Sequence, residues 1–318
     1  KKVIDFKYIN IFCAFKTMLL FFFKKDKHLG LKQFYKQTLY RMYSPEVVVA
    51  HHINGRGVEC KYLCPEIKVL IYQFAYCPKK FVKKYINCKG KYDTEGGYLD
   101  SILVYHEEDE KTLDIPKSKI FIGGSVKNNN ISLLNIKKNE NSIMYISEFD
   151  PNLKKDHYHL ECESFTIKTA NEYCEKYKKN LYIALRSNRA DKKNKAGYTR
   201  ESELSYFRNL IGNNFKYSNS DSYELANRSE LIICMSSNLG IELLARNFKV
   251  LFLPYHDHFG EEIYPYLPKE NNFFVYRDYE KKEIFNKINN LLIMPENSWV
   301  ENLHASMNLV KFDKGNKI

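Results

Sequence analysis

Short apolar runs alternate with amphipathic stretches along most of this chain. The runs are rich in Val, Ile, Leu, Tyr and Phe and end in turn residues, a pattern typical of buried strands. The stretches between several of them have the apolar periodicity of helices. This alternation of strand and helix predicts an α/β protein with parallel sheets. We expect its main strands at residues 47–50, 67–72, 101–105, 119–122, 142–146, 180–185, 231–235 and 249–253.

The clearest unit of strand, turn, helix and strand lies between residues 221 and 254. An apolar run at 231–235 leads into Ser236-Ser237-Asn238, where a helix is expected to begin, and a second apolar run follows at 249–253. The turn therefore falls at the carboxyl end of a parallel strand. Doubly wound sheets bind their ligands at such ends.

The residue types in this turn suit an anion. Small hydroxyl side chains and Gly240 would let the N–H groups of the helix N-terminus approach a phosphate closely. Glu242, one turn further on, offers a carboxylate that can accept from ribose hydroxyls. Ser236, Ser237 and Asn238 are also good N-caps, and capping alone is the alternative for any one of them. For the turn as a whole we favour a phosphate site.

Two other predicted strands deliver polar residues to their carboxyl ends. Arg186 follows the run at 180–185 and suits a bidentate grip on a phosphate or a carboxylate. A solvated basic loop is the alternative, since several lysines follow. Gly124 and Ser125 follow the run at 119–122 and would either contact a ligand or form only a tight turn.

The formal net charge of +12 favours an anionic partner, such as a nucleotide, a nucleic acid or an acidic membrane surface. The lysines are scattered among many acids, so the composition of an AT-rich genome is the alternative explanation. Basic residues are not clustered with aromatic residues into one motif, and we therefore expect no nucleic-acid partner.

Cysteine and histidine spacing does not predict a metal site. Cys60 and Cys64 have no second closely spaced pair after them, and adjacent residues such as His256-Asp257-His258 rarely ligate one ion together. The eight cysteines lie mostly in apolar or helical segments, which favours reduced thiols. We expect no metal and no cofactor.

The segment at residues 9–23 is the most apolar of the chain, and a lysine-rich segment follows it. It is too short to span a bilayer as a helix and contains Lys16. A buried helix is one interpretation, and an interfacial helix that rests on anionic lipid is the other. Because no cleavable signal peptide is visible, we expect a cytoplasmic protein. If the segment is an interfacial helix, the protein would also contact the inner face of the cytoplasmic membrane.

Several stretches of the chain together resemble bacterial surface-carbohydrate biosynthesis proteins. They are YQFAY, DSILVY followed by KIFIGGS, LYIALRSNR and the unit at 221–253. Those are similar to glycosyltransferases of the two-Rossmann-domain (GT-B) type, including capsule and O-antigen enzymes that transfer Kdo from CMP-Kdo. The resemblance covers roughly residues 45–295. It implies an α/β fold of two Rossmann-like domains facing a cleft, with an acceptor-side domain at 1–140, a nucleotide-sugar-binding domain at 141–296, and a terminal helix and tail at 297–318.

The resemblance also implies roles for individual residues. Ser236 and Ser237 match a double-serine motif that binds donor phosphate, and Arg186 would face the donor's phosphate or its sugar carboxylate. The nucleotide pocket would be lined by Asp221, Ser222 and Glu242.

Two departures from the family pattern concern catalysis. Gln73 matches the start of a Gln-His-Gly pattern, but Phe74 and Ala75 replace the His and the Gly, and a His-Pro pair is absent. A carboxylate of the first domain would then activate the acceptor hydroxyl or form a covalent intermediate. The candidates are Asp93 and Glu95, in a loop that contains glycine. The alternative is that both are ordinary acidic residues of a loop without a catalytic role.

The function that we expect is a metal-independent glycosyltransferase. It would move a sugar from a CMP- or UDP-linked donor to a glycan or glycolipid acceptor, with Arg186 and a helix N-terminus offsetting the leaving-group charge. A sugar-nucleotide epimerase of the UDP-GlcNAc 2-epimerase type and a non-catalytic carbohydrate-binding protein are the alternatives. An isomerase would need paired acid and base groups around the sugar, and the sequence does not locate such a pair.

Overall fold

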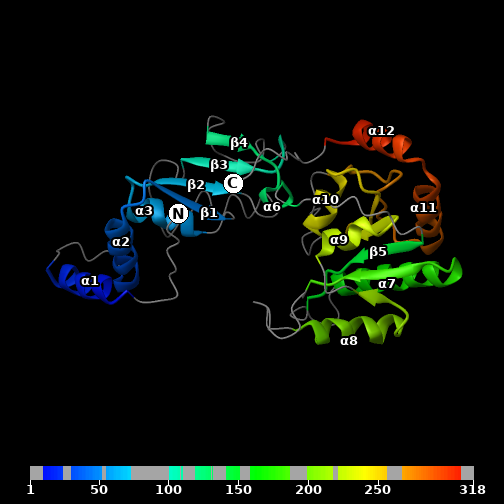
Figure 1. The fold of residues 1–318 in the computed structure, drawn as a ribbon, viewed down its shortest axis with the longest axis horizontal. Coiled ribbons are helices and arrows are strands. Elements are labelled where there is room, and N and C mark those ends of the chain that lie inside the picture. The colour runs from blue at the N-terminus through cyan, green and yellow to red at the C-terminus, as the bar shows by residue number, and fades with distance from the viewer. Residues whose placement is uncertain are drawn as a thin grey trace. The chain divides into compact units, whose positions relative to one another are not determined.

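The computed structural model describes residues 10–23, 30–51, 55–72, 100–107, 109, 119–129, 131, 141–150, 158–186, 199–217, 221–255 and 267–308. The chain forms two compact units, Lys1–Val126 (unit 1) and Lys127–Ile318 (unit 2). Each unit has its own parallel sheet (Figure 1). The prediction of an α/β fold with two Rossmann-like halves is thereby confirmed.

The sheet of unit 1 has four parallel strands in the order β1-β2-β3-β4. The order follows the chain, so each connection crosses to the next neighbouring strand. Side chains from the sheet and from the helices α2 and α3 form one buried cluster that includes Phe34, Leu63, Val69 and Ile71. The elements of the unit are β1 (Val47–His51), β2 (Lys68–Tyr72), β3 (Ser101–Val104), β4 (Ile120–Ile122), α1 (Ile11–Phe23), α2 (Leu31–Tyr43) and α3 (Gly55–Leu63).

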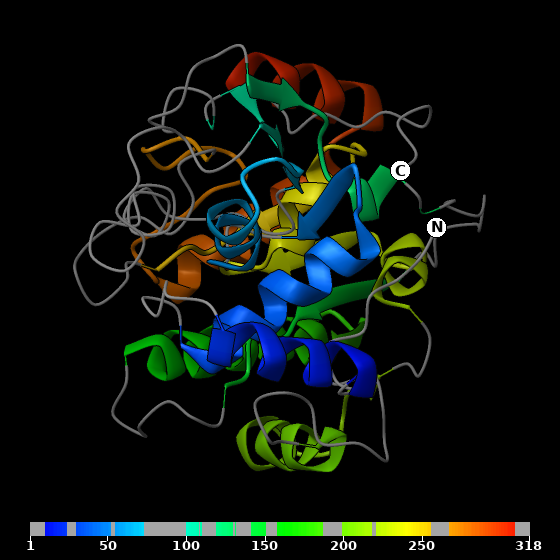
Figure 2. The same cartoon turned by 90° about the vertical axis from the view of Figure 1, so that its left-hand side faces the viewer.

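At the N-terminal side of unit 1, α1 lies against α2 (Figure 2). Cys13 and Thr17 are buried in this contact, and the Phe21 ring meets the Phe34 ring with centroids 5.9 Å apart. Among the residues that the structure describes, no helix is both long and apolar enough to cross a membrane. The contact with α2 covers only one side of α1.

The sheet of unit 2 has five parallel strands in the order β7-β6-β5-β8-β9. Nearly all of its central residues are buried, as the continuous apolar runs of the sequence predict for strands that are covered on both faces. The strands are β5 (Ser142–Ile146), β6 (Asn180–Ala184), β7 (Lys216–Tyr217), β8 (Leu231–Cys234) and β9 (Val250–Phe252). The main helices are α7 (Tyr158–Lys176), α8 (Arg200–Ile211), α9 (Ser222–Asn227), α10 (Asn238–Leu244), α11 (Lys281–Ile293) and α12 (Glu296–Ser306).

The contacts divide the chain after Val126, whereas the sequence predicted a boundary at residue 140. Arg246 explains the difference, because its guanidinium donates to the Asn128 side chain at 2.5 Å and to the Ile131 carbonyl at 2.8 Å. Asn128 also donates to the Glu242 carbonyl at 3.2 Å. Asn128, in the short helix α6 (Val126–Asn129), thus packs with unit 2.

The terminal helix α12 also belongs to unit 2, although the sequence analysis set residues 297–318 apart from the preceding domain. Its Trp299 is fully buried, and the indole N–H donates to the Asn247 carbonyl at 2.9 Å. The ring packs edge-on against Phe273 and Phe274. An aromatic side chain buried to this extent makes α12 a part of the core.

Candidate active site

The strand order of unit 2 marks one place on its sheet for a ligand. β5 pairs with β6 on one side and with β8 on the other, so the chain first winds away from β5 in one direction and then returns to wind in the other. Open doubly wound sheets bind ligands outside the carboxyl ends of the two strands where this reversal occurs. In unit 2 these ends lead into residues 147–150 and 235–237.

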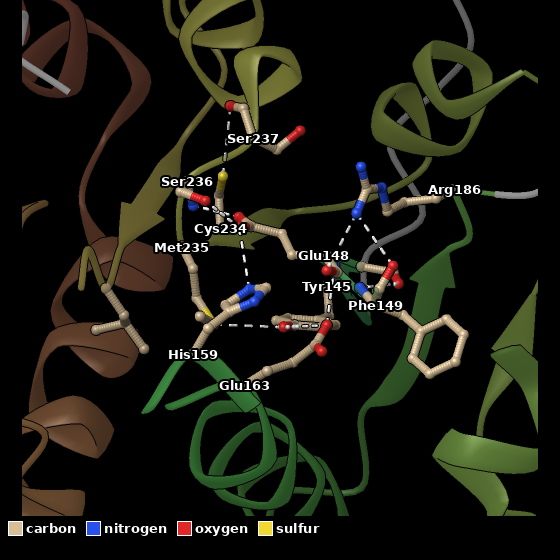
Figure 3. A network of polar contacts seen from close by, with 12 residues as sticks. Tyr145, Glu148, Phe149, His159, Glu163, Arg186, Cys234, Met235, Ser236 and Ser237 are labelled. Atoms are coloured by element: carbon tan, nitrogen blue, oxygen red, sulfur yellow. Dashed lines mark hydrogen bonds and ion pairs between the residues drawn. The ribbon is translucent and has the colours of Figure 1, made fainter. Parts of the chain in front are cut away.

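At the end of β8, the two serines of the predicted turn have different contacts. The Ser237 hydroxyl accepts from the Leu239 N–H at 3.3 Å and caps α10. Ser236 does not cap the helix. Its N–H and its hydroxyl both donate to the carboxylate of Glu148, which follows β5 (Figure 3). Donors of this turn therefore already hold an anionic group.

Behind that carboxylate lies a buried group of titratable side chains at the start of α7. His159 Nε2 lies 3.7 Å from Glu148 Oε2, and its ring stacks on Tyr255 with centroids 4.6 Å apart. One turn further along α7, Glu163 accepts from the Glu148 N–H at 2.8 Å and from the Tyr145 hydroxyl at 3.2 Å. Figure 3 shows these side chains converging below Ser236. The site thus pairs carboxylates with an imidazole.

The electrostatic consequence is clearest for Glu163. Burial raises the pKa of its carboxyl to about 7, and the Glu148 carboxylate acts in the same direction. The hydrogen bond from the Glu148 N–H, the His159 ring and the Tyr145 hydroxyl oppose this rise. Burial, assisted by Glu148, also raises the pKa of Tyr255 above its ordinary value. A group that changes charge near neutral pH therefore lies beside the strand end.

Arg186 lies at the end of β6 and contacts the same loop. Its Nη1 donates to the carbonyls of Glu148 at 3.3 Å and Phe149 at 3.0 Å, while its backbone N–H donates to the buried Glu203 carboxylate at 3.0 Å. The side chain is exposed. Because these two carbonyls occupy only Nη1, other N–H groups of the guanidinium remain for an anion.

The other predicted residues of unit 2 meet around one tyrosine. The Tyr223 hydroxyl donates to the carboxylate of Glu242, which is buried. Asp221 caps α9 by accepting from the Tyr223 N–H at 3.1 Å, and Ser222 is the first residue of that helix. Asp221 thus contacts the backbone of Tyr223 and Glu242 contacts the far end of its side chain, so the Glu242 carboxylate is bound by Tyr223 rather than open to solvent.

Packing explains why residue 240 is a glycine. A Cβ at this position would lie 2.7 Å from Cys234 Sγ and 2.8 Å from Phe252 Cζ, both closer than real Cβ contacts. Only glycine therefore lets α10 lie this close to β8 and β9. Asn238, the first residue of α10, stands at the half-buried turn.

The candidates in unit 1 fall partly outside the described residues. Gly124 and Ser125 follow β4, where the Gly123 and Gly124 N–H groups both donate to the Val104 carbonyl and Gly124 has a φ of 71°. This is the tight turn that the sequence analysis gave as the alternative. Gln73, Asp93 and Glu95 lie outside the described residues, as does the segment 256–258. Within the described ranges, no three His, Cys, Asp or Glu side chains are placed to hold a metal ion.

Glu148, His159 and Glu163 were not predicted from the sequence. A signal for them was present, because Glu148 lies two residues after the predicted strand at 142–146, and His159 and Glu163 have the four-residue spacing that places two side chains on one face of a helix. What the sequence could not supply was the pairing of β5 with β8, which brings Glu148 to Ser236 across 88 positions of the chain.

Solved structures with a similar fold include UDP-GlcNAc 2-epimerases and a protein in complex with UDP-glucose. A "putative UDP-N-acetylglucosamine 2-epimerase" from Listeria monocytogenes matches with a TM-score of 0.56 and 13% identity, over 88% of this chain and 72% of that one. UDP-GlcNAc 2-epimerase from Neisseria meningitidis, bound to UDP-GlcNAc, matches with 0.53 and 12%, over 93% and 80%. Anabaena HepE, in complex with UDP-glucose, matches with 0.50 and 10%, over 88% and 80%. At such identities the likeness concerns the fold, which is that of the two-Rossmann-domain class.

No curated protein matches the chain. The family model described as "putative O-antigen biosynthesis protein" matches residues 85–318. This match includes the whole of unit 2 and the carboxyl edge of its sheet. Since the matched residues make up well over half of the chain, the protein belongs to this family of O-antigen biosynthesis proteins.

Proposed function

We propose that this protein is a glycosyltransferase that binds a nucleotide sugar at the carboxyl edge of the unit 2 sheet and transfers the sugar during assembly of a surface polysaccharide. The observation that carries the proposal is the position of Ser236 and Ser237 at the point where the strand order reverses, in a chain of the O-antigen family. The exposed Arg186 at the end of β6 supports it, because an arginine can grip a phosphate with two N–H groups.

The donor that we favour is UDP-linked. The Neisseria epimerase was solved with UDP-GlcNAc and the Anabaena protein with UDP-glucose, and both have this fold. CMP-Kdo remains the alternative donor, since the resemblance in the sequence is to Kdo transferases. The acceptor would be a glycan or a glycolipid.

In the proposed complex the donor phosphates lie against the Ser236-Ser237 turn and Arg186. A phosphate there must displace the Glu148 carboxylate from Ser236, and His159, 3.7 Å away, is placed to receive it. The arginine and the N–H groups then offset the charge that develops on the leaving nucleotide. The nucleoside would contact Asp221, Ser222 and Asn238.

The transfer step needs no reactant besides the donor and the acceptor. The acceptor hydroxyl oxygen bonds to the anomeric carbon, the bond from that carbon to the donor phosphate oxygen breaks, and the nucleotide leaves with the electron pair. The hydroxyl proton passes to a general base, and the sequence offers the carboxylates of Asp93 and Glu95 as candidates for it.

A sugar-nucleotide epimerase is the second candidate function, and a specific observation favours it. An isomerase needs acid and base groups near the sugar, and Glu148, His159 and Glu163 provide a carboxylate, an imidazole and a carboxyl group with a pKa of about 7 at one strand end. The two candidates differ in their need for an acceptor. Conversion of UDP-GlcNAc to an isomer without any acceptor would select the epimerase, and acceptor-dependent release of UDP would select the transferase.

Nucleotide binding by the intact chain tests the proposal before any acceptor is known. We expect UDP, in a thermal-unfolding screen with CMP, CDP, UDP, GDP and ADP, to raise the midpoint by several degrees. A ligand at 100 times its Kd stabilises a folded protein by about 2.7 kcal/mol. Stabilisation by CMP alone would select the Kdo-like donor. No shift with any nucleotide would contradict both enzyme candidates and favour a non-catalytic carbohydrate-binding protein.

A further inference from the structure

Among the residues that the structure describes, helix α1 contacts unit 1 along one side. Cys13 and Thr17 are buried against α2, and the Cys13 thiol donates to the Tyr35 carbonyl at 3.7 Å. The Asn10 N–H, one residue before the helix, donates to the Tyr35 hydroxyl at 2.9 Å. These contacts fix which face of α1 points inward and which points outward.

The outward side of α1 is almost entirely apolar. Its exposed fractions range from 45% for Leu19 to 84% for Phe12, and Lys16 is the charged residue among them. Each such side chain would gain about 1.5–3 kcal/mol on full burial. Soluble monomers rarely expose a contiguous patch of this kind unless it binds something. We call this patch the outer face of α1, consisting of Ile11, Phe12, Phe15, Met18, Leu19, Phe22 and Phe23.

Charge argues against a second copy of the chain as the partner of the outer face. Two copies would bring together chains that each carry a net charge of +12.

The charges around α1 suit an anionic surface instead. Lys1, Lys2 and Lys7 precede the helix in the sequence and Lys24, Lys25 and Lys27 follow it, with Asp5 and Asp26 as the acids among them. Each lysine near an anionic membrane contributes about 1 kcal/mol of attraction. Apolar side chains combined with lysines are the two signals that stable interfacial anchoring requires.

We propose that the outer face of α1 docks unit 1 on a bilayer surface that contains anionic lipid. The phenylalanines enter the boundary between headgroups and acyl chains, and the flanking lysines contact the headgroups. The helix lies in the plane of the surface, because 13 residues are too few to span about 30 Å of hydrocarbon. The inference is independent of the proposed nucleotide site.

Co-sedimentation of the intact chain with vesicles tests this inference. We expect binding to vesicles of phosphatidylcholine with about 30% phosphatidylglycerol, and at least about tenfold weaker binding to pure phosphatidylcholine, because the lysine contribution is then lost. Raising the salt to about 0.5 M should weaken the binding to anionic vesicles as well. A chain that stays in the supernatant with anionic vesicles would overturn the proposal.

Matched variants identify the surface responsible. Phe12→Ser with Phe15→Ser and Phe22→Ser removes three exposed rings and is expected to reduce the bound fraction at least about tenfold, with the unfolding midpoint unchanged. The control replaces Phe121, Tyr217 and Ile293, which are also exposed, by serine and should bind like the wild type.

Three outcomes of these variants would each overturn membrane docking. The first is vesicle binding by the α1 variant at the wild-type level. The second is a wild type that does not bind vesicles but forms a concentration-dependent dimer, measured by light scattering, which the α1 variant does not form. A second copy of the chain would then cover the outer face. The third is a large fall in the unfolding midpoint of the α1 variant without vesicle binding by the wild type, which would show that the chain itself covers this face.

Discussion

Replacing Ser236 and Ser237 together by alanine is expected to weaken nucleotide binding by about 100-fold or more. A hydrogen bond to a charged group contributes about 1.5–3 kcal/mol, and the variant removes two hydroxyl donors from the proposed phosphate position. A loss of about 3 kcal/mol corresponds to a factor of more than 100 in Kd. Isothermal titration of the nucleotide into both proteins measures the effect.

The structure also indicates what else this variant changes. Losing the Ser237 cap of α10 costs about 1 kcal/mol of stability, so the unfolding midpoint should fall slightly. Ser229→Ala is the matched control, because this buried serine donates to the Leu225 carbonyl at 3.0 Å near the amino end of β8. The control should keep the wild-type affinity. Wild-type affinity in the double variant would remove the turn from the donor site.

Replacing Glu163 by glutamine is expected to flatten the pH dependence of unfolding. The pKa of Glu163 is about 7 in the folded chain, against an ordinary value of 4.5. Between these values the folded state binds more protons than the unfolded state, so the contribution of Glu163 is complete below pH 4.5 and is lost as the pH rises through 7. A shift of this size corresponds to about 3 kcal/mol.

A glutamine keeps an acceptor for the Glu148 N–H and carries no charge at any pH. At pH 8 the variant should therefore be more stable than the wild type, by up to about 3 kcal/mol. Denaturant unfolding at pH 5, 6, 7 and 8, followed by the fluorescence of Trp299, reports on unit 2 because this is the only tryptophan of the chain. Glu161→Gln, at an exposed position of the same helix, is the control and should leave the pH dependence unchanged. If the free energy of unfolding changed equally between pH 5 and pH 8 in the wild type and in Glu163→Gln, the raised pKa of Glu163 would be contradicted.

Much of the fold could be predicted because strand and helix periodicity is a local property of the sequence. The apolar runs at 142–146 and 231–235 appear in the structure as β5 and β8. Helix α3 could not be predicted in this way, since Gly55 and Gly57 are typical of a loop. The helix depends on packing, for Cys60 and Leu63 are buried in the cluster that they form with the unit 1 sheet.

The candidate site was predictable only as far as it is local. The double-serine turn could be located because it follows a recognisable strand, and the capping role of Ser237 follows from the same few residues. The contact between Ser236 and Glu148 depends on the strand order of unit 2, which no short stretch encodes. Burial of Glu242 beneath Tyr223 likewise depends on how α9 and α10 pack. The roles proposed for Gln73, Asp93 and Glu95 stay predictions of the sequence.

Hydrogen exchange of the intact chain, with and without the nucleotide that stabilises it most, tests the central claim most directly. The account predicts slower amide exchange in residues 147–150 and 235–240, which follow β5 and β8, and unchanged exchange in residues 228–230 before β8. Two results would contradict a donor site at this edge of the sheet. Saturating nucleotide would leave amide exchange in both segments unchanged, or it would slow exchange only in other segments.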